Sequence, residues 1–174
     1  MALPVVLCIG SASVTGDALG PLVGDLLRER YNVPAYVYGG LARPVNGVNY
    51  ERYVAHVKRV HRTSPIIAVD ACVGDERDVG MIKIVNGGIT AGGALKKNFK
   101  KVGDIGILGV VAKRSEDNLS ELLATPYLFV EKMSERMARE TVAILAKMYD
   151  CYNNISLTTQ KNHITRCKYG GAVL

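Results

Sequence analysis

The stretch VVLCIGSASVTGDALGP, residues 5–21, joins an apolar strand-like run to a glycine-containing turn that carries Asp17. A second apolar run, IIAVD at residues 66–70, closes on Asp70. In an open parallel sheet, ligands and catalytic groups collect beyond the carboxyl ends of the strands, beside the point where the strand order reverses. We therefore expect Asp17 and Asp70 to meet in one cleft and to form the chemical centre of the chain.

Apolar runs alternate with amphipathic segments along the chain, which is typical of an α/β sheet covered by helices on both faces. Five strands are expected, at residues 5–10, 35–40, 66–70, 80–88 and 106–113. Four helices are expected, at residues 22–31 and 48–61, as a short segment within 115–126 capped by Ser115 or Asp117, and at residues 127–149. The pattern predicts a three-layer α/β/α domain with a mostly parallel, twisted sheet.

The helical spacing also indicates which side chains face the sheet. In the second helix, the residues expected on the buried face are Val48, Tyr53, Val54, Val57 and Val60. Gly16, Gly20 and Gly24 recur at intervals of four, which favours close packing of the first helix rather than a dinucleotide-binding fingerprint. The same turn lacks the Lys-Ser/Thr ending of a phosphate-binding loop.

Length and charge fix the domain organisation. The 174 residues suit one domain, which we place at residues 1–150. Beyond Asp150 the periodicity fails, so residues 151–174 are expected to form a basic tail, as a flexible extension or with ISLTT and GGAVL as edge strands. The chain carries a formal charge of +6, of which Lys161, Arg166 and Lys168 in the acid-free tail supply three.

Composition argues against several classes of partner. The body has no stripe of basic residues interleaved with aromatics, and Trp is absent, so a nucleic-acid partner is not expected. The apolar start lacks a basic leader region, and the apolar runs are too short to span a membrane, so we expect a cytoplasmic protein without a membrane partner. The four cysteines show no CxxC spacing, which disfavours a zinc site, and Cys8 and Cys72 are expected in the core.

Two longer strings carry a resemblance to a known family. They are VLCIGSASVTGDALGPLVG and PIIAVDACVGDERDVGMIKIVNGGITAGGALKKNFKKVGDIGILGVV. Together they resemble the spore germination protease family, in particular its small YyaC-type sporulation relatives, within the hydrogenase maturation protease-like superfamily. The resemblance covers roughly residues 5–149 and implies a phosphorylase/hydrolase-like α/β fold. It also implies a cytoplasmic endopeptidase of the sporulating cell or spore, acting on proteins such as small acid-soluble spore proteins, in a homo-oligomer.

The resemblance implies that Asp17 and Asp70 form an aspartic-type catalytic pair. Two neighbouring carboxyls share a proton, so one activates water while the other donates to the carbonyl oxygen or the departing amine. No cofactor and no metal are expected. The glycine-rich segments beside the two acids are expected to supply substrate-binding residues, namely Thr15, Gly16, Gly87, Gly88, Thr90, Lys96 and Lys97.

The sequence is also compatible with other roles for the two acids and for the fold. Each acid has a structural alternative: Asp17 as a helix cap, and Asp70 held by hydrogen bonds at a strand end. The fold could serve a non-enzymatic sporulation protein that binds a peptide or partner in the same cleft. The two acids could belong to a metal-dependent maturation peptidase, although zinc sites usually add His or Cys ligands. A nucleophilic Cys72 with His56 or His61 is the weakest alternative.

Overall fold

The computed structural model describes residues 2–91 and 100–168, with side chains described as far as Cys151. Its sheet has five strands in the order β2-β1-β3-β5-β4. The first four strands in this order run parallel, and β4 pairs with β5 in the antiparallel direction. The strands are β1 (Val5–Cys8), β2 (Tyr36–Tyr38), β3 (Ile66–Gly74), β4 (Ile82–Asn86) and β5 (Ile105–Lys113). The expected mostly parallel sheet is confirmed.

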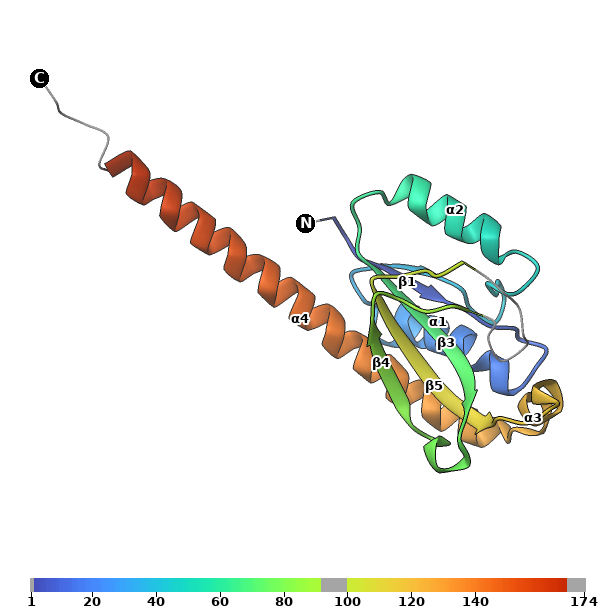
Figure 1. Cartoon of the computed structure of the whole chain (residues 1–174). Helices are drawn as coiled ribbons and strands as arrows, with labels where there is room; N and C mark the ends of the chain where they lie inside the picture. Colours follow the sequence, from blue (N-terminus) through green and yellow to red (C-terminus); the bar gives the residue numbers. More distant parts are fainter. Residues whose placement is uncertain (1, 92–99, 169–174) are drawn as a thin grey trace, which may run out of the picture.

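Helices lie on both faces of this sheet (Figure 1). The α-helices are α1 (Leu19–Asp25), α2 (Tyr50–Val60), α3 (Asn118–Ala124) and α4 (Tyr127–Lys168). Three short turns complete the elements: the 3-10 turns η1 (Gly16–Ala18) and η3 (Glu76–Asp78), and the π turn η2 (Leu26–Arg30) that extends α1. Helices α1 and α4 contact each other on one face, and α2 packs on the other, which gives the three expected layers.

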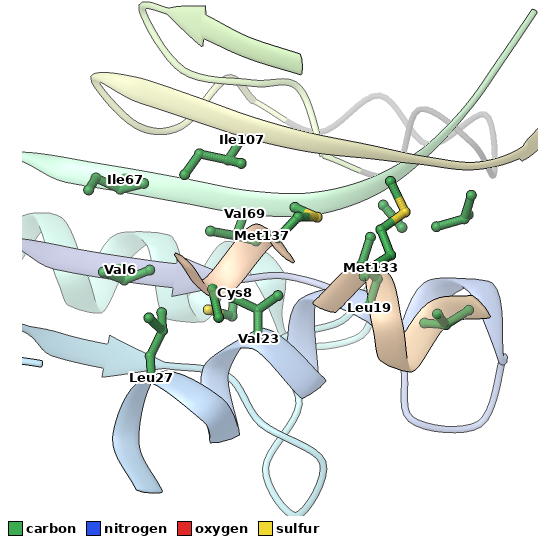
Figure 2. Packing of buried hydrophobic residues seen from close by; sticks show 14 of the residues in the cluster. Val6, Cys8, Leu19, Val23, Leu27, Ile67, Val69, Ile107, Met133 and Met137 are labelled. Atoms are coloured by element: carbon green, nitrogen blue, oxygen red, sulfur yellow. The ribbon is translucent and has the colours of Figure 1, made fainter. Parts of the chain in front are cut away.

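The larger core lies between the sheet and the α1–α4 layer (Figure 2). Leu19 and Val23 of α1 and Met133 and Met137 of α4 pack there against the central strands. Gly109 of β5 makes this fit possible, since a Cβ at that position would lie 2.4 Å from Leu19 Cδ2 and 2.7 Å from Met137 Sδ. Cys8 is fully buried in this core, as expected, and its burial raises the pKa of the thiol to about 12.

The smaller core lies beneath α2 and differs in part from the expectation. Tyr50, Val54 and Val57 form the buried face of the helix, at a spacing of four and three residues. Val48 precedes the helix and is 95% exposed, and Val60 at its end is 52% exposed, so both were wrong as core residues. Val48 lies before the first helical residue, and Val60, the last residue of α2, lies about a quarter turn to one side of the stripe formed by the three buried residues.

Helix α4 continues to Lys168, well past the end expected near Asp150. Figure 1 shows its C-terminal half projecting beyond the sheet and the other helices. ISLTT (residues 155–159) is therefore helical rather than an edge strand, whereas GGAVL lies outside the described residues. A packed helix grows by one hydrogen bond per added residue without a new nucleus, and no Gly or Pro interrupts residues 127–168. None of the helices in the described part of the chain combines the length and the hydrophobicity that a membrane span requires.

Asp117 caps α3, as one of the two sequence alternatives predicted. Its side chain accepts a hydrogen bond from the Ser120 N–H at 3.2 Å and from the Ser120 hydroxyl. The Ser120 hydroxyl, followed by the Ser120 backbone N–H, lowers the pKa of Asp117 below its ordinary value of 3.8. A carboxyl whose pKa is lowered on folding stabilises the protein above its unfolded pKa, and this contribution is lost as the pH falls through the folded value.

We expect Asp117→Ala to lower the melting temperature at pH 7, because α3 loses its capping acceptor. The difference from the wild type should shrink as the pH falls below 3.8, when the native cap is itself protonated. Circular dichroism melts at pH 7 and at stepwise lower pH test this. A difference that stays constant into acid would show that the charge on Asp117 does not stabilise α3.

Candidate active site

Asp70 lies inside β3, four residues before its end, and not at a strand terminus as the sequence indicated. The strand continues past the acid because β5 pairs with β3 as far as Gly74. The neighbouring strand β1 stops earlier, with Cys8 opposite Val69. Asp70 is therefore the first residue of β3 beyond the end of β1. Because β1 is flanked by β2 on one side and β3 on the other, this position is the switch point of the sheet.

Asp70 is 4% exposed and is the only buried carboxylate or cationic side chain in the described part of the chain. Its Oδ1 accepts a hydrogen bond from the Ala71 N–H at 2.9 Å. Side chains alternate along a strand, so Asp70 points to the same face as Ala68, which belongs to the core beneath α2. Burial of a charge is costly unless function or specific partners retain it, so this position is a strong candidate for chemistry.

Tyr50, at the start of α2, lies next to Asp70 on this face. Its side chain is 1% exposed, and its hydroxyl donates to the Lys100 carbonyl at 2.8 Å. Burial, and then the negative charge of Asp70, raises the pKa of Tyr50 to about 12. Tyr50 thus remains a neutral hydroxyl beside the carboxyl group. From the sequence, Tyr50 is expected only as part of the second helix, although its position four residues before Val54 was the available signal.

Asp17 lies in η1, which contacts β3 and so brings the turn that bears Asp17 beside the strand that bears Asp70. Its side chain is half-buried. Ala18 occupies the N-cap position of α1, so Asp17 does not cap that helix. The turn is held close to β1 by Gly10, where a Cβ would lie 2.0 Å from the Asp17 carbonyl oxygen. Gly10 also adopts a φ of +147°, which favours glycine.

The other expected residues on the first turn lie around Asp17. Thr15 is half-buried at the N-cap position of η1. Gly16 is buried and faces α3, where a Cβ would meet Leu122 Cδ2 at 2.9 Å and Thr125 Oγ1 at 3.1 Å. Gly16 therefore lets η1 pack closely on α3 and keeps Asp17 in place.

The second glycine-rich segment follows β4, and its first glycine, Gly87, does not lie near the two acids. The Gly87 N–H donates to the Asp104 carbonyl, and the Asp104 N–H donates to the Ile66 carbonyl, so Gly87 lies level with the first residue of β3. Ile66 is about 13 Å along the strand from Asp70 at the usual rise per residue. Antiparallel β4 carries the chain to that far end, and the local sequence around Gly87 does not reveal this direction.

From Gly87 the chain turns back over the face of the sheet that α2 covers. Gly88 is buried, and Ile89 pairs with Val102 in an isolated bridge. Thr90 is exposed, and Ala91 is buried in the same core as Tyr50. The segment thus runs toward Tyr50 and Lys100 near Asp70. Lys96 and Lys97 lie outside the described residues.

Alternative groups for catalysis are placed elsewhere. Tyr38 and His61 share a hydrogen bond of 2.8 Å on the β2 side of the sheet, and His56 lies against the same tyrosine. Cys72 lies on β3, and β1 separates β3 from β2 in the sheet. Neither histidine is therefore a base for Cys72. Cys72 is half-buried rather than in the core, and burial, followed by Asp70, raises the pKa of its thiol to about 11. It is not an activated nucleophile.

These observations define an α/β protein with a mostly parallel five-stranded sheet and a buried carboxylate, Asp70, at its switch point. The structure is similar to the [NiFe] hydrogenase maturation protease HycI from Thermococcus kodakarensis KOD1, with a TM-score of 0.56 at 19% identity, covering 83% of this chain and 93% of HycI. At this identity the likeness shows the fold. The maturation protease HybD from Thermococcus kodakarensis gives a TM-score of 0.42 at 16% identity, covering 80% of this chain and 99% of HybD.

The chain belongs to the family described as "Protein of unknown function (DUF1256)", whose model matches residues 3–140. It is also 40% identical over 107 residues to the "Uncharacterized protein YyaC" of Bacillus subtilis (strain 168). That match covers 62% of this chain and 52% of the relative, so the chain spans about half the length of the relative.

Proposed function

We propose that this protein is an endopeptidase in which the carboxyl groups of Asp17 and Asp70 hydrolyse a peptide bond. The observation that carries the proposal is the placement of Asp70, a carboxylate buried within the sheet at the switch point, beside the turn that bears Asp17. Three further features support it: Asp17 does not cap α1, the fold is similar to that of a hydrogenase maturation protease, and the Asp17 side chain is only half-buried.

The chemistry requires one ionised and one protonated carboxyl. The ionised group takes a proton from water, which attacks the peptide carbonyl, while the protonated group donates first to the carbonyl oxygen and then to the departing amine. The two groups titrate as a unit, so the base and the acid are properties of the pair. The hydroxyl of Tyr50 stays neutral near Asp70 and donates its proton to the Lys100 carbonyl, so it adds no charge to this environment.

The resemblance of the two longer strings to germination proteases supports a sporulation role and makes small acid-soluble spore proteins the first substrates to test. The same resemblance supports a homo-oligomer, which we include in the proposal.

A resident metal fits the site poorly. No group of three His, Cys, Asp or Glu side chains that could hold a metal is found among the described residues. Of the three histidines in the sequence, His56 and His61 lie on the β2 side of the sheet, and His163 belongs to the C-terminal half of α4. Asp17 and Asp70 alone give a donor set unlike that of catalytic zinc sites, so we route no step through a metal.

The test is incubation of the full chain with purified small acid-soluble spore proteins, followed by mass spectrometry of the fragments. We expect cleavage at a small number of defined bonds, and we expect the same rate after treatment with a chelator. Loss of cleavage on chelation and its return with a divalent ion would replace the proposal by a metal peptidase. Stable binding of the substrate without fragments would favour a binding protein that uses the same cleft.

A further inference from the structure

Two adjoining pockets share the side chains of Tyr38 and Tyr53. The smaller part, of about 280 Å³, is lined by Tyr38, Arg52, Tyr53 and His56. The larger part, of about 480 Å³, extends past Gly39 to Arg43 and is also lined by Asp25, Arg28 and Glu29. Neither part is lined by Asp17 or Asp70, and we call the two parts together the Tyr38–Tyr53 pocket. Their volumes are close to the lower end of the range for small-ligand sites, which is about 300 Å³.

Aromatic rings form the wall of this pocket. The Tyr38 ring meets the Tyr53 ring edge-on, with centroids 6.3 Å apart at 72°, and meets the His56 ring at 5.9 Å and 70°. The hydroxyl of Tyr38 is already engaged with His61 Nε2 at 2.8 Å, which fixes the ring in place. A fixed, half-buried ring offers a flat surface against which another ring can pack.

The charges around the rings are mainly positive and only partly neutralised. Arg28 is paired with Asp25 at 2.5 Å and donates to the Gly39 carbonyl at 2.9 Å, so these two residues hold the loop. Within the described part of the chain, neither Arg43 nor Arg52 takes part in an ion pair. Glu29, on the wall of the larger part, is the remaining acid of the lining.

Helix α2, which supplies Arg52, Tyr53 and His56 to the lining, strengthens this field. Between residues 51 and 62 it and its C-terminal extension carry one acid, Glu51, against a set of basic and imidazole side chains: Arg52, His56, Lys58, Arg59, His61 and Arg62. An anion that approaches α2 is therefore attracted toward the pocket.

We propose that the Tyr38–Tyr53 pocket binds a small ligand in which a phosphate or carboxylate is attached to a planar ring. The oxyanion lies between Arg43 and Arg52, which provide charge-assisted hydrogen bonds, and the ring packs on Tyr38 and Tyr53. The site does not depend on the proposed peptidase activity, because Asp17 and Asp70 take no part in it.

The test uses the ¹⁵N-labelled full chain in NMR titrations with phenyl phosphate, phenylacetate and phenol. We expect both anions to bind more tightly than phenol and to shift the amides of residues 37–43 and 52–56. Tighter binding of phenyl phosphate assigns a phosphate ligand, and equal or tighter binding of phenylacetate assigns a carboxylate. Equal affinity for phenol would overturn the proposal, as would shifts located elsewhere.

Matched arginine variants separate this site from general attraction by a basic helix. Arg43→Ala and Arg52→Ala are each expected to weaken phenyl phosphate binding by about tenfold, which corresponds to one lost charge-assisted hydrogen bond. Arg59→Ala removes an exposed arginine one turn beyond His56, outside the pocket lining, and should change the affinity by less than about twofold, as expected of a screened charge. Equal weakening in all three variants would overturn the assignment. Tighter binding of an oligonucleotide that also shifts Arg59 and Arg62 would assign the surface to nucleic acid instead.

Discussion

Replacement of Asp70 by Asn is expected to lower kcat for peptide cleavage by a factor of about a hundred to ten thousand, the usual contribution of a positioned acid or base. An amide can neither take a proton from water nor deliver one to the amine. Its carbonyl oxygen can still accept the Ala71 N–H, which Asp70 Oδ1 accepts at 2.9 Å, so the local backbone keeps its hydrogen bond. Cleavage of a purified substrate, measured under saturating conditions, gives the comparison.

The controls distinguish lost chemistry from lost structure. Asp75→Asn removes an exposed acid that pairs only loosely with Arg77, at 3.7 Å, and should leave cleavage unchanged. Asp17→Asn should lose activity to a similar degree, and the double variant little more than either single one, because the two groups act as a unit. The Asp70→Asn protein should melt no earlier than the wild type, since a neutral amide avoids the cost of a buried charge. Full activity of Asp70→Asn would remove the aspartate pair from the mechanism.

Gly20→Ala should destabilise the protein by about 3 kcal/mol, the upper part of the usual range for overpacking. In an exposed helix the same change normally gains about 1 kcal/mol, because Ala has the higher helix propensity. Here a Cβ would lie 1.9 Å from the Ile9 carbonyl oxygen and 2.8 Å from the Ile9 carbonyl carbon. Backbone atoms cannot rotate away, so α1 must move off β1, and the turn that bears Asp17 must move with it.

Urea unfolding followed by far-ultraviolet circular dichroism measures this loss. Gly74→Ala is the matched control, because its Cβ would meet only side-chain atoms, the nearest being Val110 Cγ1 at 2.9 Å. A side chain can shift, so we expect a smaller loss of stability. If Gly20→Ala were as stable as the wild type, the close contact between α1 and β1 would not exist in solution.

The position of Asp70 illustrates what local sequence leaves open. From the sequence, the run IIAVD is expected to stop at its acid, because a charge normally ends an apolar strand. The strand continues because β5 supplies a pairing partner up to Gly74, and that partner is distant in sequence. Gly87 shows the same effect in reverse: the sequence predicts it beside the two acids, yet antiparallel β4 leaves it at the far end of the sheet.

The sequence alone determined the order of the strands and helices, the buried runs, the close approach of the first helix and the two candidate acids, because periodicity and glycine spacing are local properties. Only the tertiary structure decided which residues meet. It placed η1 against β3, Tyr50 beside Asp70, and Arg43 with Tyr38 and Tyr53 around one pocket. These contacts join segments that are far apart in the chain, and strand pairing and helix packing, rather than local preference, bring them together.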